Sequence, residues 1–336
     1  MLRNLINLCI TLFLVGAVLA PCVISGTGPV PSASRTGAQL ALRPNTGGAP
    51  LASDSDQKIV IGANLVDVAV SVSDSHGRFV PGLTRGEFEV FDNGVKQQVT
   101  HFSDIDAPIS IGIVYDTSGS MEGNISRSAY ALSRFIETSH DQDAFFLVTF
   151  SGRPVIAQDF SRGDPTSMLN RLASARPSGQ TALYDAVLLA LDRVKQGPHA
   201  RQAILVISDG RDNHSDHTFA DLRTAVREAG VIIYAIGITT GAGDRQPDVG
   251  RLVLTQLAET SGGRAFFPVS YDQAGVVQDC DRIALELRHQ YALGFYPTDP
   301  GNTRYHRIRV KLDAPRDLGR LSLSYRTTYP SFQHSR

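Results

Sequence analysis

Between residues 109 and 289, the chain alternates short apolar runs with segments of helical periodicity. The runs Ile109–Tyr115, Ala203–Ser208 and Val231–Ile238 have no polar alternation, which is typical of strands buried on both faces. In the intervening segment Ser126–Ser139, the apolar residues are spaced to form one stripe of a helix. This order predicts an α/β fold, with a doubly wound, mostly parallel sheet covered by helices on both faces.

A β-rich segment precedes this region. Valines alternate with small or polar residues from Val66 to Val72, which is the pattern of a half-buried strand. The turn Asp92-Asn93-Gly94 predicts a hairpin between Phe88–Phe91 and Val95–Phe102, because Asn-Gly tolerates the positive φ of a tight turn. The spacing of Thr84 and Glu87 predicts a capping box and a single helical turn.

A second β-rich segment follows residue 290. Its expected strands are Tyr291–Tyr296, Tyr305–Leu312 and Leu321–Arg326. Neither flank has enough apolar residues for a core of its own. We therefore expect the two flanks to pair across the α/β region and to form a small β-sandwich-like domain.

The amino end has the pattern of an export signal. Arg3 precedes the apolar run Leu5–Leu19, which is short for a membrane-spanning helix. The signal is either cleaved near Ser25 or retained as an anchor. Leu19-Ala20-Pro21-Cys22 also resembles a bacterial lipoprotein processing site, although Pro21 departs from that pattern, so lipidation of Cys22 is an alternative.

The expected organisation is a signal peptide or anchor (1–25), a flexible linker (26–57), a β segment (58–104), an α/β domain (108–290) and a C-terminal β segment (291–329). The linker is rich in Gly, Pro, Ala, Ser and Thr and poor in large apolar residues. The formal net charge of −1 excludes a basic field for nucleic acid. Any membrane contact is expected only through the N-terminal segment. Cys280 alone lies in the body of the protein, so no internal disulfide is expected there.

Oxygen-bearing side chains follow two of the predicted strands. Asp116, Ser118 and Ser120 alternate after the first apolar run, Asp209 follows the second, and Thr181 precedes a helix. In an open α/β sheet, ligands bind at the carboxyl ends of strands where the strand order reverses. Carboxylate and hydroxyl oxygens suit a hard cation such as Mg²⁺. If the two strands are neighbours at that reversal, Asp116 and Asp209 face each other, Thr181 enters from the adjoining loop, and the five residues form one candidate cation site.

Each of these residues also has a simpler explanation when it is considered alone. Asp116 and Ser118 could cap the following helix, and Thr181 could cap the helix that it precedes. Asp209 could belong to an Asp-Gly turn. These local roles do not explain why all of them fall at one edge of one sheet.

Three motifs resemble the metal-ion-dependent adhesion site (MIDAS) of the von Willebrand factor type A (VWA) domain: Asp116-Thr117-Ser118-Gly119-Ser120, Gly179-Gln180-Thr181 and Ser208-Asp209-Gly210. The resemblance implies a Rossmann-like domain in which Ser118, Ser120 and Thr181 bind Mg²⁺ directly. Asp116 and Asp209 would bind the ion directly or through water. Mn²⁺ and Ca²⁺ are alternatives. The resemblance further implies that Asp or Glu of a partner protein completes the coordination.

The flanks resemble bacterial VWFA-related proteins at Gly82-Leu83-Thr84, Phe88-Glu89-Val90 and Tyr291–Tyr296. Together with the export signal, the resemblance implies an exported protein-binding module. Its expected location is the periplasm, the cell surface or the exterior, with membrane anchoring as an option. Two polar segments, Arg211–His217 and Gly241–Pro247, are expected to form a rim that selects the partner.

Two other chemistries remain as alternatives. His214 and His217 leave zinc open, although tetrahedral sites usually need a better-spaced ligand set. A Mg²⁺-dependent phosphohydrolase would also place an Asp after the first strand. The haloacid dehalogenase pattern requires a second Asp two residues later, where this chain has Ser118, and a hydroxyl cannot donate that proton at neutral pH. We therefore expect no enzymatic activity. A structural domain with an idle metal site is a further alternative.

Overall fold

The computed structural model describes residues 65–104, 106–162, 166–238, 249–268, 273–298, 303–315 and 318–332. The predicted signal peptide, the linker and the rim segment Gly241–Pro247 lie outside these ranges. Within them, no helix has the length and apolar character needed to cross a membrane. The predicted domain boundaries stay predictions.

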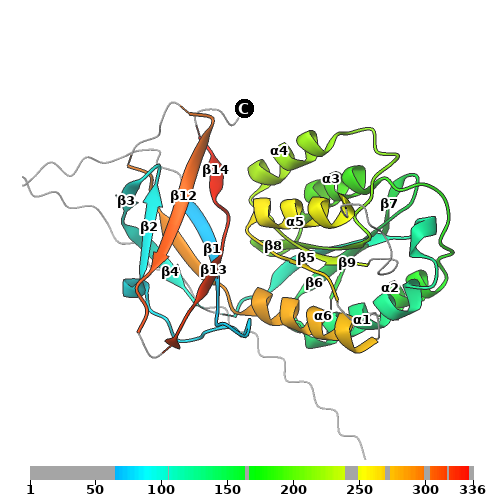
Figure 1. Ribbon diagram of the computed structural model, residues 1–336, viewed down its shortest axis with the longest axis horizontal. Helices are drawn as coiled ribbons and strands as arrows, with labels where there is room; N and C mark the ends of the chain where they lie inside the picture. The colour runs from blue at the N-terminus through cyan, green and yellow to red at the C-terminus, as the bar shows by residue number, and fades with distance from the viewer. Residues whose placement is uncertain are drawn as a thin grey trace, which may run out of the picture. The chain divides into compact units, whose positions relative to one another are not determined.

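The central sheet has the strand order β10-β9-β8-β5-β6-β7, and in Figure 1 it lies between two layers of helices. Its strands are β5 (Ile109–Asp116), β6 (Ala144–Phe150), β7 (Pro154–Arg162), β8 (Arg201–Ser208), β9 (Ile232–Gly237) and β10 (Ala265–Phe266). Only the edge strand β7 is antiparallel to its neighbour, and the other pairs are parallel. The prediction of a mostly parallel sheet is confirmed.

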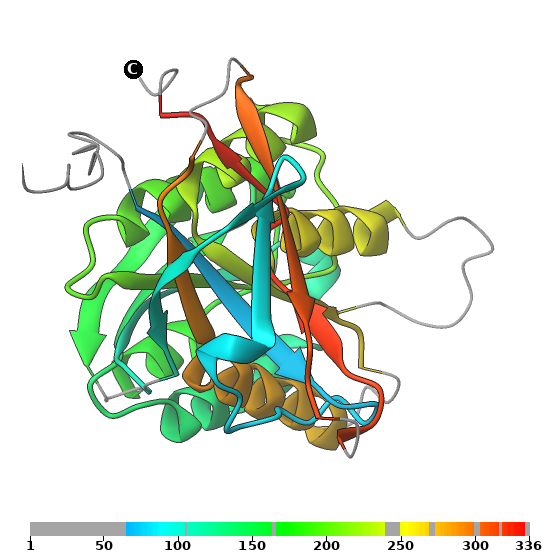
Figure 2. The same cartoon turned by 90° about the vertical axis from the view of Figure 1, so that its left-hand side faces the viewer.

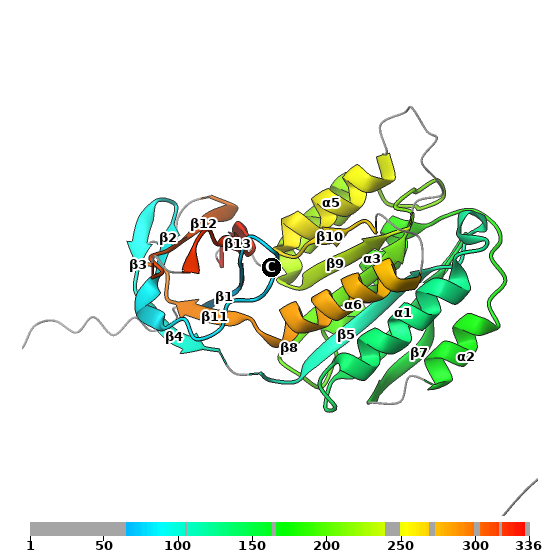
Figure 3. The same cartoon turned by 60° about the horizontal axis from the view of Figure 1, so that its bottom comes forward.

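Helices cover both faces of this sheet. They are α1 (Ile125–Thr138), α2 (Thr166–Ala173), α3 (Leu183–Val194), α4 (Phe219–Ala229), α5 (Val249–Ser261) and α6 (Gln273–Arg288). Figure 3 shows α6, α1 and α2 side by side on one face, whereas α3, α4 and α5 lie on the other (Figure 1). Each group packs its apolar stripe into a separate hydrophobic cluster with the sheet, which is the doubly wound arrangement.

The strand order reverses between β5 and β8. From β5 the chain builds outward through β6 and β7, and it then returns to β8 on the other side of β5. The two strands are parallel neighbours, with Val114 opposite Val206, and all residues of β5 are buried. The carboxyl ends of β5 and β8 are therefore adjacent, as the sequence predicted.

The flanks form two further sheets, with strand orders β13-β1-β11-β4 and β14-β12-β2-β3. Their strands are β1 (Val66–Ser73), β2 (Phe88–Asp92), β3 (Val95–Gln97), β4 (Val99–Ser103), β11 (Tyr291–Phe295), β12 (Tyr305–Leu312), β13 (Ser322–Ser324) and β14 (Thr328–Pro330). The pairs β1–β11 and β2–β12 join strands from before and after the α/β region, as expected (Figure 2). One hydrophobic cluster combines Val70 and Tyr291 of one sheet with Val90 and Val310 of the other. That the two sheets form a separate domain stays a prediction.

The prediction of one strand over Val95–Phe102 is wrong, because the chain changes sheets there. β3 ends at Gln97 and pairs with β2, and β4 begins at Val99 and pairs with β11. The Gln97 side chain is buried and exchanges hydrogen bonds with Thr298 of 3.1 and 3.2 Å, which fixes the crossover point. The short strand β14 was not predicted, since it contains Pro330, and proline is confined to sheet edges.

Candidate metal centre

Asp116 is the last residue of β5 and is fully buried. Its Oδ1 accepts a hydrogen bond of 2.9 Å from the Ser118 backbone N–H, and its Oδ2 accepts one of 2.6 Å from the hydroxyl of Ser208. Because Ser208 ends β8, the carboxylate is fixed between the ends of two neighbouring strands. Ser208 is not among the predicted site residues, since a serine at a strand end carries no signal of its own.

The hydroxyls of Ser118 and Ser120 lie 3.0 Å apart on the loop after β5. Ser118 precedes a short 3-10 helix, Gly119–Met121, but its side chain makes no capping hydrogen bond. Helix α1 begins later, after Asn124. The alternative that Asp116 and Ser118 cap the next helix is therefore wrong. The Asp116 carboxylate accepts from the Ser118 N–H and the Ser208 hydroxyl, and the Ser118 hydroxyl bonds to that of Ser120.

Asp209 follows β8 on the neighbouring loop and is 6% exposed. Its Oδ1 accepts a hydrogen bond of 3.0 Å from the Arg211 backbone N–H. The turn expected for Asp-Gly is present, since Gly210 has a φ of 79°. Asp209 is also close enough to Asp116 for its charge to act on the Asp116 carboxyl, so the turn and the acidic pair coexist.

Thr181 is buried on a third loop, just before α3. The N-cap of α3 is Ala182, so the alternative that Thr181 caps this helix is wrong. Backbone hydrogen bonds attach the loop to that of Asp116: the Ser178 N–H donates to the Thr117 carbonyl, and the Gly119 N–H donates to the Gly179 carbonyl. The structure thus connects the loops that carry all five predicted residues.

The pKa of the Asp116 carboxyl is raised, mainly by burial. Hydrogen bonds from Ser118 and Ser208 lower it, whereas the charge of Asp209 raises it further. Two buried carboxylates that repel each other are stabilised by a cation between them. The donor set of two carboxylates and three hydroxyls consists only of oxygens, which suits Mg²⁺ or a similar hard cation. The residues therefore fit the implied metal.

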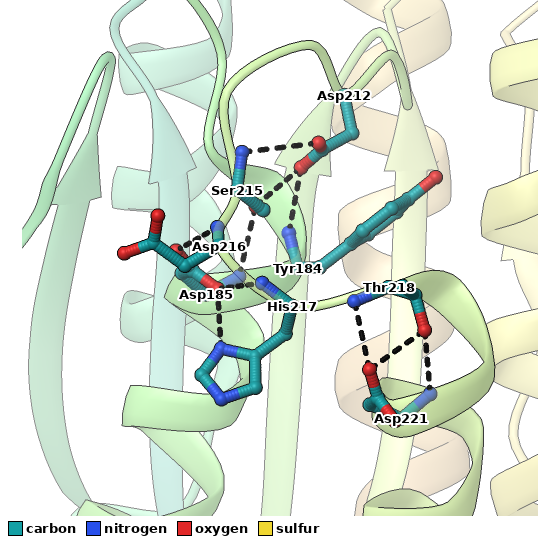
Figure 4. A network of polar contacts seen from close by, with 8 residues as sticks. All are labelled: Tyr184, Asp185, Asp212, Ser215, Asp216, His217, Thr218 and Asp221. Atoms are coloured by element: carbon teal, nitrogen blue, oxygen red, sulfur yellow. Dashed lines mark hydrogen bonds and ion pairs between the residues drawn. The ribbon is translucent and has the colours of Figure 1, made fainter.

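The polar segment after Asp209 packs against the start of α3 (Figure 4). Ala182 has no side-chain oxygen, and the first-turn N–H groups of α3 instead find acceptors on this segment. The Tyr184 N–H donates to Asp212 Oδ2 (3.0 Å), and the Asp185 N–H donates to Ser215 Oγ (3.1 Å). The segment predicted as a partner-selecting rim thus also caps a helix of the domain.

The zinc alternative finds no support in this segment. His217 Nδ1 lies 2.8 Å from Asp185 Oδ1, which accepts its hydrogen bond, and the His214 backbone N–H donates to the Thr181 carbonyl. Among the residues that the structure describes, no three His, Cys, Asp or Glu side chains are grouped to hold a metal ion. Three of the five residues predicted for the oxygen site carry hydroxyls and are not of these four types.

The ion pair between His217 and Asp185 predicts a pH-dependent contribution to stability. The hydrogen bond that His217 donates to the Asp185 carboxylate raises the pKa of His217 above 6.5 against some desolvation, and the charges of Asp185, Asp221 and Asp216 act in the same direction. Burial raises the pKa of Asp185, but hydrogen bonds from Asp216 and His217 outweigh it and hold the pKa below 3.8. The contribution is therefore present between pH 3.8 and 6.5 and is lost as the pH rises through the folded pKa of His217.

We expect the melting temperature of His217→Gln to fall below that of the unchanged protein at about pH 5 and to match it at about pH 9. The difference should be small, because the His217 side chain is 57% exposed. Thermal unfolding at both pH values measures it. A difference that is equal at the two pH values would contradict the assignment to this ion pair.

Helix α5 makes an unusually close contact with the Asp209 loop. A Cβ built on Gly250 would lie less than 3.0 Å from the Asp209 carbonyl oxygen, and one on Gly210 would lie as close to the Gly250 carbonyl. Real Cβ atoms do not approach other atoms so closely. The two glycines therefore let the backbone of the loop rest directly on the first turn of α5.

Residues 111–211 match the family model of the von Willebrand factor type A domain. No curated protein matches the chain. A von Willebrand factor type A structure from Catenulispora acidiphila has 16% identity and a TM-score of 0.45, covering 79% of this chain and 72% of its own.

Two further solved structures are similar. The vWF domain of the type V pili tip protein Mfa5 from Porphyromonas gingivalis has 12% identity and a TM-score of 0.44, covering 54% of this chain and 95% of its own. Proximal thread matrix protein 1 from the mussel byssus, solved with a zinc-occupied MIDAS motif, has 20% identity and a TM-score of 0.44. That match covers 58% of this chain and 49% of the mussel protein. The family match over residues 111–211 covers the region that carries all five predicted site residues.

Proposed function

We propose that the α/β part of this chain is a metal-dependent protein-binding module. Its divalent cation, Mg²⁺ or alternatively Mn²⁺ or Ca²⁺, is held by Asp116, Ser118, Ser120, Thr181 and Asp209. The observation that carries the proposal is the pair of buried carboxylates, Asp116 and Asp209, at the carboxyl ends of the neighbouring strands β5 and β8, where the strand order reverses. This is the place at which open α/β sheets bind ligands.

The chemistry of the donors favours a protein partner that presents an acidic side chain. Mg²⁺ takes about six oxygen ligands in an octahedron. Three of the five residues offer neutral hydroxyls, so the bound ion keeps positive character that attracts a further carboxylate. An Asp or Glu of the partner therefore completes the coordination. Arg211 and Asn213, on the segment that follows Asp209, are exposed.

The proposed location is outside the cytoplasm. Arg3 and the apolar run Leu5–Leu19 support export, and the protein would then act in the periplasm, on the cell surface or in the medium. Retention of the segment, or lipidation of Cys22, would keep the module at the membrane. The module is proposed to have no enzymatic activity.

A Mg²⁺-dependent phosphohydrolase is the alternative to exclude by experiment. It would need a general acid two residues after Asp116, and the side chain there is the buried hydroxyl of Ser118, 3.0 Å from the Ser120 hydroxyl. Neither group donates a proton readily at neutral pH. This observation favours the binding module over the enzyme.

Calorimetric titration of Mg²⁺ and Mn²⁺ into the purified protein tests the proposal. We expect saturable binding of one ion and a rise in melting temperature with metal concentration. The same preparation should show no turnover of a generic phosphate monoester. Absence of any metal-dependent heat or thermal shift would contradict the metal site, and turnover that disappears in Asp116→Ala would favour the phosphohydrolase.

A further inference from the structure

We propose that Asn213 is a positioning residue of the metal site, which sets the place of the Thr181 hydroxyl. The inference rests on the function proposed above and extends it to a residue outside the five ligands. It arises from the polar segment Arg211–His217, whose contacts separate into two kinds. One kind holds Thr181, and the other caps α3.

Asn213 makes hydrogen bonds to both backbone polar groups of Thr181. The Thr181 N–H donates to Asn213 Oδ1 (2.8 Å), and the Thr181 carbonyl accepts from the Asn213 N–H (3.0 Å). A third bond of 3.1 Å comes from the His214 N–H to the same carbonyl. The peptide groups around Thr181 are thus tied to the segment that follows Asp209, across 32 residues of sequence.

The loop of Thr181 needs such an external support. Gly179 has a φ of 80°, and the N-cap Ala182 makes no side-chain capping bond. A Mg²⁺ site tolerates little displacement of a ligand, because the ion demands near-ideal octahedral geometry at about 2.0–2.1 Å. A hydroxyl on a loop reaches that precision only when its backbone is fixed by neighbouring hydrogen bonds.

Capping of α3 is carried by different side chains of the same segment. Asp212 accepts from the Tyr184 N–H and Ser215 from the Asp185 N–H, and neither of these bonds involves Thr181. Asn213 itself is exposed, so replacing it removes a specific contact and no core packing. Positioning of the ligand and stability of the helix can therefore be altered separately.

The test compares Asn213→Leu, Asn213→Asp and Ser215→Ala in the complete protein. Leucine has a similar size and no acceptor, and aspartate keeps an acceptor oxygen at the same position. Ser215→Ala removes one cap of α3 and the hydrogen bond from Ser215 Oγ to Asp212 Oδ2, but no contact with Thr181. Calorimetric titration gives the dissociation constant of Mg²⁺, and urea unfolding in a chelator gives the stability of the metal-free protein. Amide hydrogen exchange at Thr181 reports its backbone directly.

We expect Asn213→Leu to weaken Mg²⁺ binding by about 10–100-fold, as is typical when a group that orients a metal ligand is lost, and to accelerate exchange of the Thr181 amide. Asn213→Asp should bind at least as tightly as the unchanged protein. Ser215→Ala should lower the unfolding midpoint and leave the dissociation constant within about twofold.

An unchanged dissociation constant in Asn213→Leu would overturn this inference and leave the proposed function intact. The same would follow if Ser215→Ala weakened Mg²⁺ binding as much as Asn213→Leu, because the effect would then be a general loss of structure. If the unchanged protein bound no divalent cation, the proposed function would fail, and this inference would fail with it.

Discussion

Replacing Asp116 with asparagine is expected to abolish Mg²⁺ binding without weakening the metal-free protein. The carboxylate is fully buried, and its pKa is raised by burial and by the nearby charge of Asp209. Removing its charge relieves that repulsion. An asparagine keeps one oxygen to accept from the Ser118 N–H. Its amide N–H can donate to the Ser208 hydroxyl, which in the unchanged protein is the donor to Asp116.

Ligand linkage sets the size of the expected effect. At a Mg²⁺ concentration of about 100 times the dissociation constant, the unchanged protein gains about 2.7 kcal/mol of unfolding free energy. Asp116→Asn should gain none, and its stability in a chelator should equal or exceed that of the unchanged protein. Urea unfolding with and without Mg²⁺ measures both quantities in one experiment.

Asp143→Asn is the matched control. Asp143 is another buried carboxylate with a raised pKa due mainly to burial, and it accepts from the backbone N–H groups of Ile109 and His140 at the opposite end of β5. This variant should keep the full gain from Mg²⁺, whatever its basal stability. If Asp116→Asn retained the gain, or if Asp143→Asn lost it, the metal would not be bound at the carboxyl ends of β5 and β8.

The sequence predicted the place of the site because the physical signal there is strong. Ile109–Tyr115 and Ala203–Ser208 are apolar without interruption, which occurs when a strand is buried on both faces. Once both are central strands of a doubly wound sheet, their carboxyl ends lie close together. The prediction also required β5 and β8 to be neighbours, and the strand order meets that condition.

Contacts between distant segments could not be predicted in the same way. Helix α3 begins at Leu183 without a capping side chain of its own, and its first N–H groups are satisfied by Asp212 and Ser215. Rules for helix caps consider only residues adjacent in sequence. The division of Val95–Phe102 between two sheets was missed for a similar reason, since the crossover is fixed by Gln97 and Thr298, about two hundred residues apart.

The contact between Gly210 and Gly250 also has no signature in the sequence. Gly210 follows an Asp, and Asp-Gly is a common turn. Gly250 lies in the first turn of α5, where glycine has no conformational advantage. Only the fold shows that the two backbones touch, and that the loop bearing Asp209 has no room to move toward α5.

Gly250→Ala is therefore expected to weaken both the fold and the metal site. Alanine favours a helix by about 0.5–1 kcal/mol over glycine, but the new methyl group would lie less than 3.0 Å from the Asp209 carbonyl oxygen. Overpacking of this kind costs about 1–3 kcal/mol, so the net effect is a loss of stability. Relief of the clash requires Asp209 or α5 to shift, and we expect Mg²⁺ affinity to fall by about tenfold or more.

Gly86→Ala is the control for the added methyl group. A Cβ at Gly86 would meet only the Thr84 hydroxyl, at the ordinary contact distance of 3.9 Å. We expect this variant to keep both its unfolding free energy, within about 1 kcal/mol, and its Mg²⁺ affinity. Gly250→Ala could also lose stability but bind Mg²⁺ as tightly as Gly86→Ala. That result would mean that helix α5 shifts to accommodate the methyl group and Asp209 stays in place. The close contact would then support the fold without fixing Asp209.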